Sequence, residues 1–417
     1  MHATTRRSLV KAATALPLLT ATGILRAAEP DLSALINMAA AARPIDAGER
    51  ARRLSRAQAL MTANGIGAVA IEPGSSMVYF TGVRWGRSER PTIAILPADG
   101  QPLIVTPFFE EPSVRQTLAV PADVRVWQED EDACRIAAAW LRERWLDRRP
   151  LAIEETMRSF IATGLAAAAP DARQVSANHV VRGCRMVKTP AEIALMQLAT
   201  DVTMAAYRWT QPRVEKGMTG REIGALMNAA TTKLGGSPEF ALALIGPAAA
   251  LPHGSREMIR VGDGQVILMD CGCTVQDYQS DVSRTWVHGA ASKEQRAVWD
   301  QVAAGQQLAF RTARIGAPAG AVDDAVRGFY ARLGYGPEYK LPGLSHRTGH
   351  GIGMDGHEPV NLVHGETTRL AAGMCFSDEP GLYLPGKFGV RLEDCFHMTE
   401  SGPAWFSRPA RSLDEPI

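Results

Sequence analysis

The fold is decided by the stretch Met269-Asp-Cys-Gly-Cys-Thr-Val-Gln-Asp-Tyr-Gln-Ser-Asp-Val-Ser-Arg-Thr285. The apolar run 266–269 in front of Asp270 has the pattern of a buried strand, and a second β-prone run, 282–287, follows Asp281. A hairpin that turns within 274–277 brings the two aspartates close together. Two ionised carboxylates opposed on a half-buried sheet repel each other, so one of them stays protonated or a cation lies between them.

The cation that such a site binds depends on the other ligands. Carboxylate oxygens suit Mn, Mg or Ca, and additional histidines extend the choice to Zn, Co or Fe. Strand alternation places Asp270 and Gly272 on one face and Cys271 and Cys273 on the other, so the cysteine pair does not share this site. At this chain length the six cysteines form no disulfide framework, and we expect small buried thiols.

Composition points to a globular protein of two domains. The chain has 417 residues, of which 46% are hydrophobic and 21% charged, which supports an ample core. Its net charge of +1 comes without a basic stripe, so we expect no nucleic-acid partner.

Residues 1–30 have the pattern of a twin-arginine signal peptide. Thr5-Arg-Arg-Ser-Leu-Val-Lys11 precedes a mostly apolar run, 12–25, and small residues follow at Ala27 and Ala28. We therefore expect an exported protein, periplasmic or secreted. The alternative is an Ala-rich N-terminal helix of the fold. The apolar run is too short and too interrupted for a membrane span, so the mature form has no predicted membrane anchor.

Residues 31–180 have the pattern of a small α/β domain. A charged amphipathic helix is expected over 45–64, ending at Asn64-Gly65, and a second helix over 132–145. Short β-prone runs separated by Pro/Gly turns lie at 68–71, 92–96, 103–106, 124–127 and 151–153. The segment Tyr79-Phe-Thr-Gly82 and the following Arg84-Trp85 are interpreted as a loop.

Residues 181–417 form the second predicted domain. Capping boxes at Thr189, Thr219 and Ser292 predict three helices. The segments 217–240 and 316–339 end in similar turns, Leu-Gly-Gly-Ser-Pro-Glu-Phe and Leu-Gly-Tyr-Gly-Pro-Glu-Tyr. Self-similarity at a fixed offset predicts a duplicated α+β half-domain with a site between the halves.

Three further groups complete a candidate metal set with Asp270 and Asp281. His350 lies in a Gly-rich stretch whose backbone can approach a ligand closely, Glu379 precedes a Pro-Gly turn, and Glu393 lies on a strand-like segment. Five such ligands suffice for two divalent ions with bridging carboxylates, the arrangement that amide hydrolysis needs.

These motifs resemble the pita-bread metallopeptidases of family M24: Xaa-Pro aminopeptidases, prolidases and methionine aminopeptidases, with creatinase as a metal-free relative. The resemblance implies an α+β fold, in which a C-terminal pita-bread domain follows a smaller creatinase-like α/β domain. It implies two divalent ions, Mn first, with Co, Zn or Fe also suitable. It also implies a small peptide substrate and a homodimer or higher homo-oligomer.

The resemblance assigns roles to individual residues of this chain. The implied metal ligands are Asp270, Asp281, His350, Glu379 and Glu393, with Asp281 and Glu393 bridging. Glu379 is also the implied proton acceptor. The remaining catalytic positions are His253, His346 and His357, which hold the substrate carbonyl, stabilise the gem-diolate and protonate the leaving nitrogen. Arg391 and Tyr383 match positions that lie behind the ligands and orient the substrate.

The expected function is hydrolysis of the N-terminal bond of Xaa-Pro peptides by an exported dinuclear enzyme. The alternative is a non-peptide hydrolase or a lyase acting on a small carboxylate or betaine-type substrate. We expect an additional acidic ligand beside Asp270 in such lyases, where this chain has Gly272. Asp277 departs from the Gly that relatives often have in the loop between the two aspartates.

Overall fold

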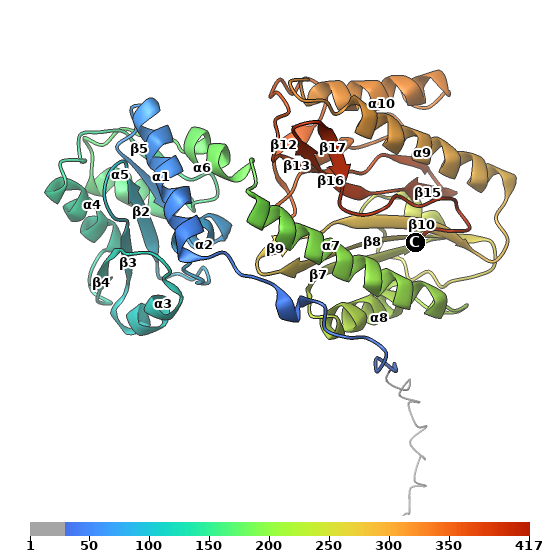
Figure 1. Ribbon diagram of the computed structural model, residues 1–417, viewed down its shortest axis with the longest axis horizontal. Helices are drawn as coiled ribbons and strands as arrows, with labels where there is room; N and C mark the ends of the chain where they lie inside the picture. The colour runs from blue at the N-terminus through green and yellow to red at the C-terminus, as the bar shows by residue number, and fades with distance from the viewer. Residues whose placement is uncertain (1–29) are drawn as a thin grey trace, which may run out of the picture. The chain divides into compact units, whose positions relative to one another are not determined.

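The computed structural model describes residues 30–417 of the chain (Figure 1). The predicted twin-arginine signal therefore lies outside the described residues. Residues 32–417 form one compact unit. The predicted domain boundary near residue 180 lies within helix α6 (Asn178–Arg185), and the division into 31–180 and 181–417 stays a prediction.

The N-terminal part is a six-stranded sheet in the order β4-β3-β2-β1-β5-β6. β1 pairs antiparallel with β2 and parallel with β5, as expected for an α/β arrangement. The strands are β1 (Ala68–Ile71), β2 (Ile93–Pro97), β3 (Leu103–Pro107), β4 (Asp123–Trp127), β5 (Leu151–Ile153) and β6 (Gln174–Ser176). The predicted strand runs are thus confirmed to within a residue or two.

The side chains of β1 point alternately to the two faces of this sheet, and both faces are buried. Val69 and Ile71 pack into a core formed with α1, α2 and α6, whereas Ala68 and Ala70 face a second core formed with α4 and α5. A strand buried on both faces reads as a continuous apolar run. The helices are α1 (Ala47–Ala63), α2 (Ser75–Thr81), α3 (Glu111–Thr117), α4 (Ala133–Glu143) and α5 (Ser159–Ala168).

The interpretation of residues 79–82 as a loop is wrong. Residues Ser75–Thr81 form helix α2, and Gly82 ends it in the left-handed conformation with φ 82°. Tyr79 and Phe80 are buried in the core on this helix. A helix of seven residues is too short to show a helical repeat in the sequence. Arg84 and Trp85 lie outside helix α2, in the segment interpreted as a loop.

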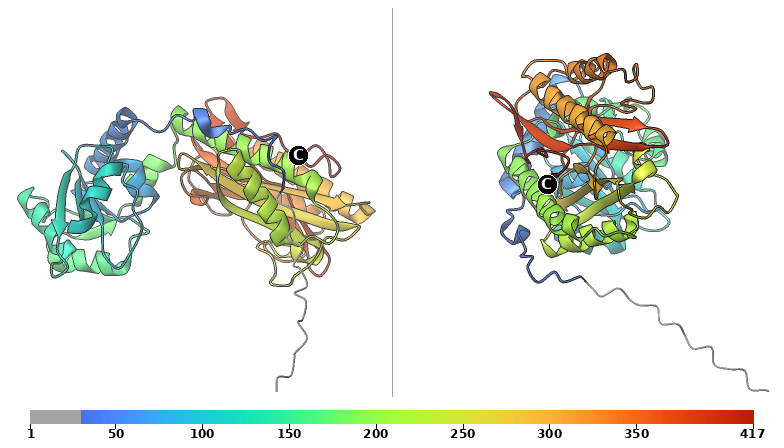
Figure 2. Two further views of the ribbon diagram at one scale, coloured as in Figure 1. Left: turned by 90° about the horizontal axis from the view of Figure 1, so that it is seen from below. Right: turned by 90° about the vertical axis from the view of Figure 1, so that its right-hand side faces the viewer.

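The C-terminal part contains two sheets flanked by pairs of helices. One sheet has the order β10-β8-β7, with β9 paired to β8, and the other has the order β12-β11-β13-β16-β17. Figures 1 and 2 show α7 and α8 on one side of the strands and α9 and α10 on the other. The helices are α7 (Pro190–Thr210), α8 (Gly220–Lys233), α9 (Lys293–Thr312) and α10 (Gly320–Arg332).

The strands of this part carry the candidate site. The first sheet consists of β7 (Ser237–Ile245), β8 (Gln265–Val275), β9 (Tyr278–Gln279) and β10 (Val282–His288). The second sheet consists of β11 (Gly349–Gly351), β12 (Glu358–Leu362), β13 (Cys375–Asp378), β16 (Asp394–Thr399) and β17 (Gly402–Trp405). A separate hairpin consists of β14 (Gly381–Leu384) and β15 (Phe388–Arg391). The α+β fold class predicted from the sequence is confirmed.

All three predicted capping boxes are present, at the starts of α7, α8 and α9. The two similar turns also match in backbone conformation, since Gly235 and Gly334 have φ values of 95° and 93°. In each half a pair of helices, α7 and α8 or α9 and α10, precedes an antiparallel sheet. The halves differ in their connections, because α8 leads directly into β7 whereas a strand follows α10 only at β11. Among residues 30–417, no helix combines the length and the apolar character needed to cross a bilayer.

Helix α8 lies unusually close to the backbone of β7. A Cβ atom at Gly220 would be 2.1 Å from the carbonyl oxygen of Ala243, and one at Gly224 would be 2.6 Å from that of Ala241. Real Cβ atoms essentially never come so close, so only glycine permits this packing. The contact covers β7, one of the two edge strands of its sheet.

We predict that Gly224→Ala destabilises the protein despite the better helix propensity of alanine, by about 1–3 kcal/mol, because the added methyl group overpacks the α8–β7 contact. The matched control is Gly328→Ala in α10, where the nearest atom to an added Cβ is a flexible arginine tip at 3.7 Å. That substitution is expected to be neutral or stabilising. Denaturant unfolding of both variants measures the difference, and equal stability of the two would contradict the packing argument.

Candidate functional site

The predicted site residues gather in one cavity of about 1000 Å³. Nine of the ten predicted residues line it: His253, Asp270, Asp281, His346, His350, His357, Glu379, Arg391 and Glu393. The tenth, Tyr383, is buried directly behind the wall, where its hydroxyl group contacts His346 and Arg391. The structure thus brings all ten predicted residues together.

Asp270 and Asp281 lie on the predicted hairpin. β8 and β10 pair antiparallel with Asp270 opposite Ser283, and the chain turns at Gln276 and Asp277. Both turn residues have positive φ, 46° and 73°, a conformation for which glycine is usually preferred. The Asp277 carboxylate forms a two-pronged ion pair with Arg84, which stabilises this turn.

The other candidate ligands come from the second sheet. His350 is the central residue of β11, Glu379 follows β13, and Glu393 lies between β15 and β16. Backbone hydrogen bonds between Ser283 and Glu393, at 3.3 and 3.1 Å, join this sheet to β10. Glu393 is therefore fixed next to the hairpin that carries Asp281.

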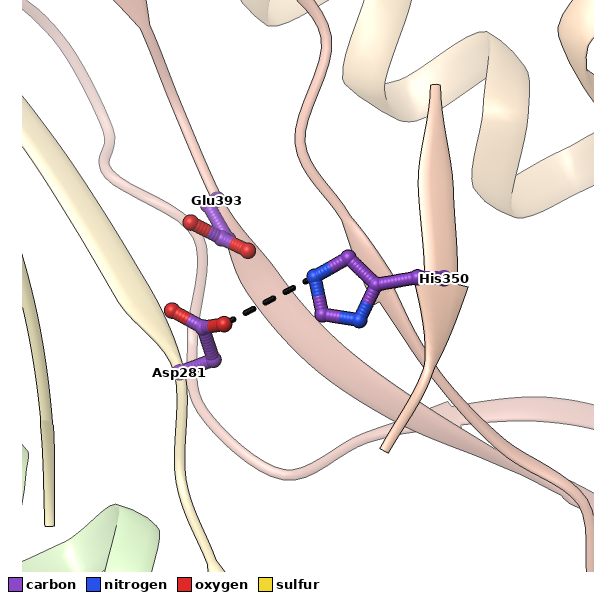
Figure 3. A group of neighbouring side chains, drawn as sticks. All are labelled: Asp281, His350 and Glu393. Carbon is purple, nitrogen blue, oxygen red and sulfur yellow. Dashed lines mark ion pairs between the residues drawn. The ribbon is translucent and has the colours of Figure 1, made fainter. Parts of the chain in front are cut away.

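Asp281, His350 and Glu393 converge on a common point (Figure 3), with one ligand atom of each within 4.8 Å of the others. His350 Nε2 lies 3.7 Å from Asp281 Oδ2 and 3.4 Å from Glu379 Oε1. Asp270 contributes to the same cavity, and its Oδ2 accepts a hydrogen bond of 2.5 Å from Arg391.

Unsatisfied oxygen atoms show that this group fits metal ions. Within residues 30–417, Asp270 Oδ1, Asp281 Oδ1 and Glu393 Oε1 are buried without a hydrogen-bond partner. Buried polar atoms almost always have a partner, and a bound ion is one of the accepted explanations for an exception. Oxygen donors with one imidazole suit Mn, and also Co, Zn or Fe.

Burial strongly perturbs the acids and the imidazole of the site. Burial, together with neighbouring carboxylates, raises the pKa of Asp281 and of Glu393 well above the usual range. Burial likewise raises the pKa of Glu379 to about 7. All three pKa values are raised because several carboxylates are buried close together, away from water. Bound cations would lower these pKa values again.

His350 has the protonation state that a metal ligand needs. Burial lowers its pKa to about 3, so the ring is neutral at physiological pH. Its Nδ1 lies 3.0 Å from the Gly351 carbonyl oxygen, so Nδ1 carries the proton and donates it there. The lone pair of Nε2 then faces the carboxylates.

Arg391 stabilises the site through hydrogen bonds to several of its residues. Besides Asp270, it donates to Ser283 Oγ at 3.0 Å and to the hydroxyl group of Tyr383 at 3.2 Å. His346 Nδ1 donates to the Arg347 carbonyl oxygen at 2.7 Å, which leaves Nε2 to accept from Tyr383 at 2.7 Å. Both ring nitrogens of His346 are thus engaged, while His253 and His357 are exposed on the cavity wall.

A buried ion pair beside the site was not predicted from the sequence. Arg284 Nη2 lies 2.7 Å from Asp394 Oδ1, and both side chains are 0% exposed. Arg284 also donates to the Glu393 carbonyl oxygen at 2.8 Å, so it contributes to fixing that ligand. The available signal was the position of Arg284 between Val282 and Trp286, on the buried face of a β-prone run.

Comparison with known proteins gives two family matches. Residues 194–400 match the model of metallopeptidase family M24, and residues 53–187 match the creatinase/prolidase N-terminal domain. The first match covers the five candidate metal ligands, and the second covers all six strands of the N-terminal sheet.

Individual relatives align over most of the chain. A probable dipeptidase PepE of Mycobacterium tuberculosis is 32% identical, over 86% of this chain and 95% of its own. A Xaa-Pro dipeptidase of Lactobacillus helveticus is 31% identical, over 80% of this chain and 91% of its own. The crystal structure of dipeptidase PepE from Mycobacterium ulcerans superposes with a TM-score of 0.82 at 31% identity, covering 89% of this chain and 99% of that one.

We predict that divalent metal stabilises the protein through these carboxylates. Mn added to metal-stripped protein at 100 times its dissociation constant should raise the free energy of unfolding by about 2.7 kcal/mol. Asp281→Asn should remove this gain. It should also make the stripped protein more stable than stripped wild type, because one of the crowded charges is gone.

Thermal unfolding with and without Mn tests both effects. The control variant is Asp300→Asn on the exposed side of α9, which should behave as wild type does. A full Mn response in Asp281→Asn would show that this carboxylate does not bind the ion.

Proposed function

This chain is a metal-dependent peptidase of family M24, and we propose that it hydrolyses the N-terminal peptide bond of Xaa-Pro peptides with two divalent ions. The observation that carries the proposal is the convergence of Asp281, His350 and Glu393, two of them with unpaired oxygens, in a cavity that also has an apolar wall. Phe240, Leu242, Leu251 and Pro252 line that wall. Such a wall suits a proline ring, and the Lactobacillus helveticus relative is a Xaa-Pro dipeptidase.

We assign the ions to Asp270, Asp281, His350, Glu379 and Glu393. When bound, two divalent ions lower the pKa of a water molecule and polarise the substrate carbonyl group. Asp281 and Glu393, which approach each other from different sheets, are placed to bridge. The neutral ring of His350 presents its Nε2 lone pair to the same point.

Glu379 is placed to accept the proton of the attacking water. Its carboxylate lines the cavity beside His350, with Oε1 3.4 Å from His350 Nε2, where it can accept a proton from a water molecule and return it. The nitrogen of a peptide bond must receive a proton as it leaves, and the proline nitrogen is no exception. Returning the proton of the water to that nitrogen completes the hydrolysis.

The histidines divide into two groups in this proposal. His253 and His357, exposed on the cavity wall, hold the substrate carbonyl group, stabilise the gem-diolate and assist the proton transfer. His346 positions Tyr383, and through it Arg391, because both of its ring nitrogens are used within the protein. Assembly as a homodimer or larger oligomer stays a prediction of the family resemblance.

We further propose that the protein is exported, on the basis of the twin-arginine pattern of residues 1–30. Twin-arginine export carries folded proteins, which suits a metal enzyme. Cell fractionation is the test: the mature chain should be periplasmic or secreted, and Arg6→Lys with Arg7→Lys should retain it in the cytoplasm. An unprocessed cytoplasmic wild type would contradict export.

The direct test of the proposed reaction is hydrolysis by metal-stripped protein with and without Mn. A Xaa-Pro dipeptide should be cleaved only with metal, and a dipeptide without proline should be cleaved more slowly. If metal-loaded protein cleaves no peptide, the proposal fails, and a small non-peptide carboxylate or betaine becomes the next substrate class to assay.

We predict that Glu379→Gln lowers kcat by at least about 10²-fold, the lower range for loss of a general base. His253→Ala and His357→Ala should also lose activity but retain metal, because neither is assigned as a ligand. Kinetics and elemental analysis on the same samples separate the two kinds of loss. Near-normal turnover in Glu379→Gln would remove the assigned base, and metal loss in either histidine variant would overturn the ligand assignment.

A further inference from the structure

The position of His357 depends on the loop that carries it. This loop, residues 352–357, connects β11 to β12. In the described part of the chain the ring of His357 forms no hydrogen bond, and it contacts the ring of His350 edge to face, with centroids 4.1 Å apart. A side chain without a hydrogen bond of its own is placed by its backbone, so the residues that fix the loop also fix His357.

The loop encloses the carboxylate of Glu358, the first residue of β12. Oε1 of Glu358 accepts hydrogen bonds from the backbone N–H groups of Met354, at 3.0 Å, and Asp355, at 3.2 Å. A Cβ atom at Gly353 would be 2.9 Å from both carboxylate oxygens, so the loop backbone lies directly against them. Successive backbone N–H groups that point at one place form an anion site, and here a side chain of the protein occupies it.

Two cations bind the same carboxylate. Lys188 Nζ lies 3.0 Å from Oε2 and Arg185 Nη2 lies 2.5 Å from Oε1, while Lys188 and Glu358 are each only 5% exposed. Burial alone would raise the pKa of Glu358, but the two cations and a loop N–H group lower it to about 2, so the carboxylate is ionised at neutral pH. Arg185 also donates to Ser76 Oγ of α2 at 3.0 Å, which joins the network to the N-terminal part.

The loop is also bonded to the hairpin that carries Asp270 and Asp281. Gln279 of β9 donates its backbone N–H to the Gly353 carbonyl oxygen at 2.8 Å and its side-chain amide to the Met354 carbonyl oxygen at 3.1 Å. The loop therefore has fixed contacts on two sides, the buried carboxylate on one and the hairpin of the candidate metal ligands on the other.

A gain in stability does not by itself explain a cluster of charges buried to this degree. Removing ions from water costs about as much free energy as their attraction returns, and apolar side chains of similar volume are often at least as stabilising. Charge-assisted hydrogen bonds are short and strongly oriented, which suits a group that keeps a loop in one conformation. The cluster therefore fits a role in placing the loop.

We propose that Glu358 is a positioning residue for His357: its carboxylate fixes the loop so that the imidazole ring lies against His350 and reaches the substrate carbonyl group. This inference rests on the proposed function and assigns a role to a charge that does not take part in the reaction itself. Without the carboxylate the loop relaxes and the ring leaves its place on the cavity wall, while the metal ligands stay where they are.

The kinetic test uses metal-loaded protein and a Xaa-Pro dipeptide. In Glu358→Ala, kcat should fall about 10- to 100-fold and KM should change less, as expected when a catalytic group is misplaced by about 1 Å. Metal content should not change. The double variant Glu358→Ala with His357→Ala should be no slower than His357→Ala alone, because the ring through which Glu358 acts is already absent.

A matched pair of variants separates loop fixation from folding. Lys188→Met is combined with Glu358→Gln or with Glu358→Leu, so that neither protein has an unpaired lysine at this place. Glutamine still accepts hydrogen bonds from the loop N–H groups and should retain most of the wild-type kcat. Leucine accepts none and should show the loss seen in Glu358→Ala, even if that single variant folds poorly.

The control for general destabilisation is Glu72→Ala. Glu72 is also a buried carboxylate with two arginine partners, Arg87 and Arg158, and it also accepts from one backbone N–H group, but it follows β1 in the N-terminal sheet. Its loss should lower the melting temperature and leave kcat unchanged. Melting temperature and metal content are measured on every sample.

Histidine NMR gives a readout that needs neither substrate nor metal. With the histidines labelled at Cε1, the signal of His357 should be displaced by the ring current of His350, and His357→Ala identifies this signal. In Glu358→Ala the signal should move toward the position of a free histidine, and in Glu72→Ala it should stay where it is in wild type.

Three outcomes would overturn the role of Glu358 and leave the proposed function standing: an unchanged kcat in Glu358→Ala, losses that add in the double variant, or equal kcat in the glutamine and leucine variants. Absence of dipeptide cleavage by metal-loaded wild type would overturn the proposed function instead. The histidine spectra would then still show whether Glu358 places the ring of His357.

Discussion

The site depends on the junction between β10 and the segment that carries Glu393. Ser283 and Glu393 exchange two backbone hydrogen bonds, and the next residues in each segment, Arg284 and Asp394, form an ion pair with no solvent exposure. This junction is the connection that sets Glu393 beside Asp281. Removing one partner of a buried ion pair typically costs about 3–5 kcal/mol, because the other charge is left without compensation.

The junction holds together charges that would otherwise separate. Asp270, Asp281, Glu379 and Glu393 share the cavity, and Arg391 is the cation that pairs with one of them. Crowded carboxylates favour protonation in the absence of cations, and the same crowding strengthens the binding of cations. The strands of the two sheets thus keep the acidic side chains close together, and this preorganises them for metal binding. Stability given up locally in this way is typical of functional sites.

Much of this could be predicted from local sequence. Capping boxes at Thr189, Thr219 and Ser292 gave the helix starts, because they depend on residues three positions apart. The hairpin between Asp270 and Asp281 followed from apolar runs on either side of a polar turn. The grouping of His350, Glu379 and Glu393 with them required the family resemblance, since local pattern does not reveal which distant segments meet.

What could not be predicted depends on pairing between segments. Helix α2 is too short to show a period, and its apolar residues are explained by the core around them. The use of both nitrogens of His346 depends on where Tyr383 lies.

In the proposed assignment, two metal ions occupy the space between the two sheets. Anomalous diffraction from crystals of the Mn-loaded protein, recorded at the manganese absorption edge, tests it most directly. Two peaks are expected, both in contact with Asp281 and Glu393, one also with Asp270 and the other also with His350 and Glu379. A single peak, or no peak between these residues, would contradict it.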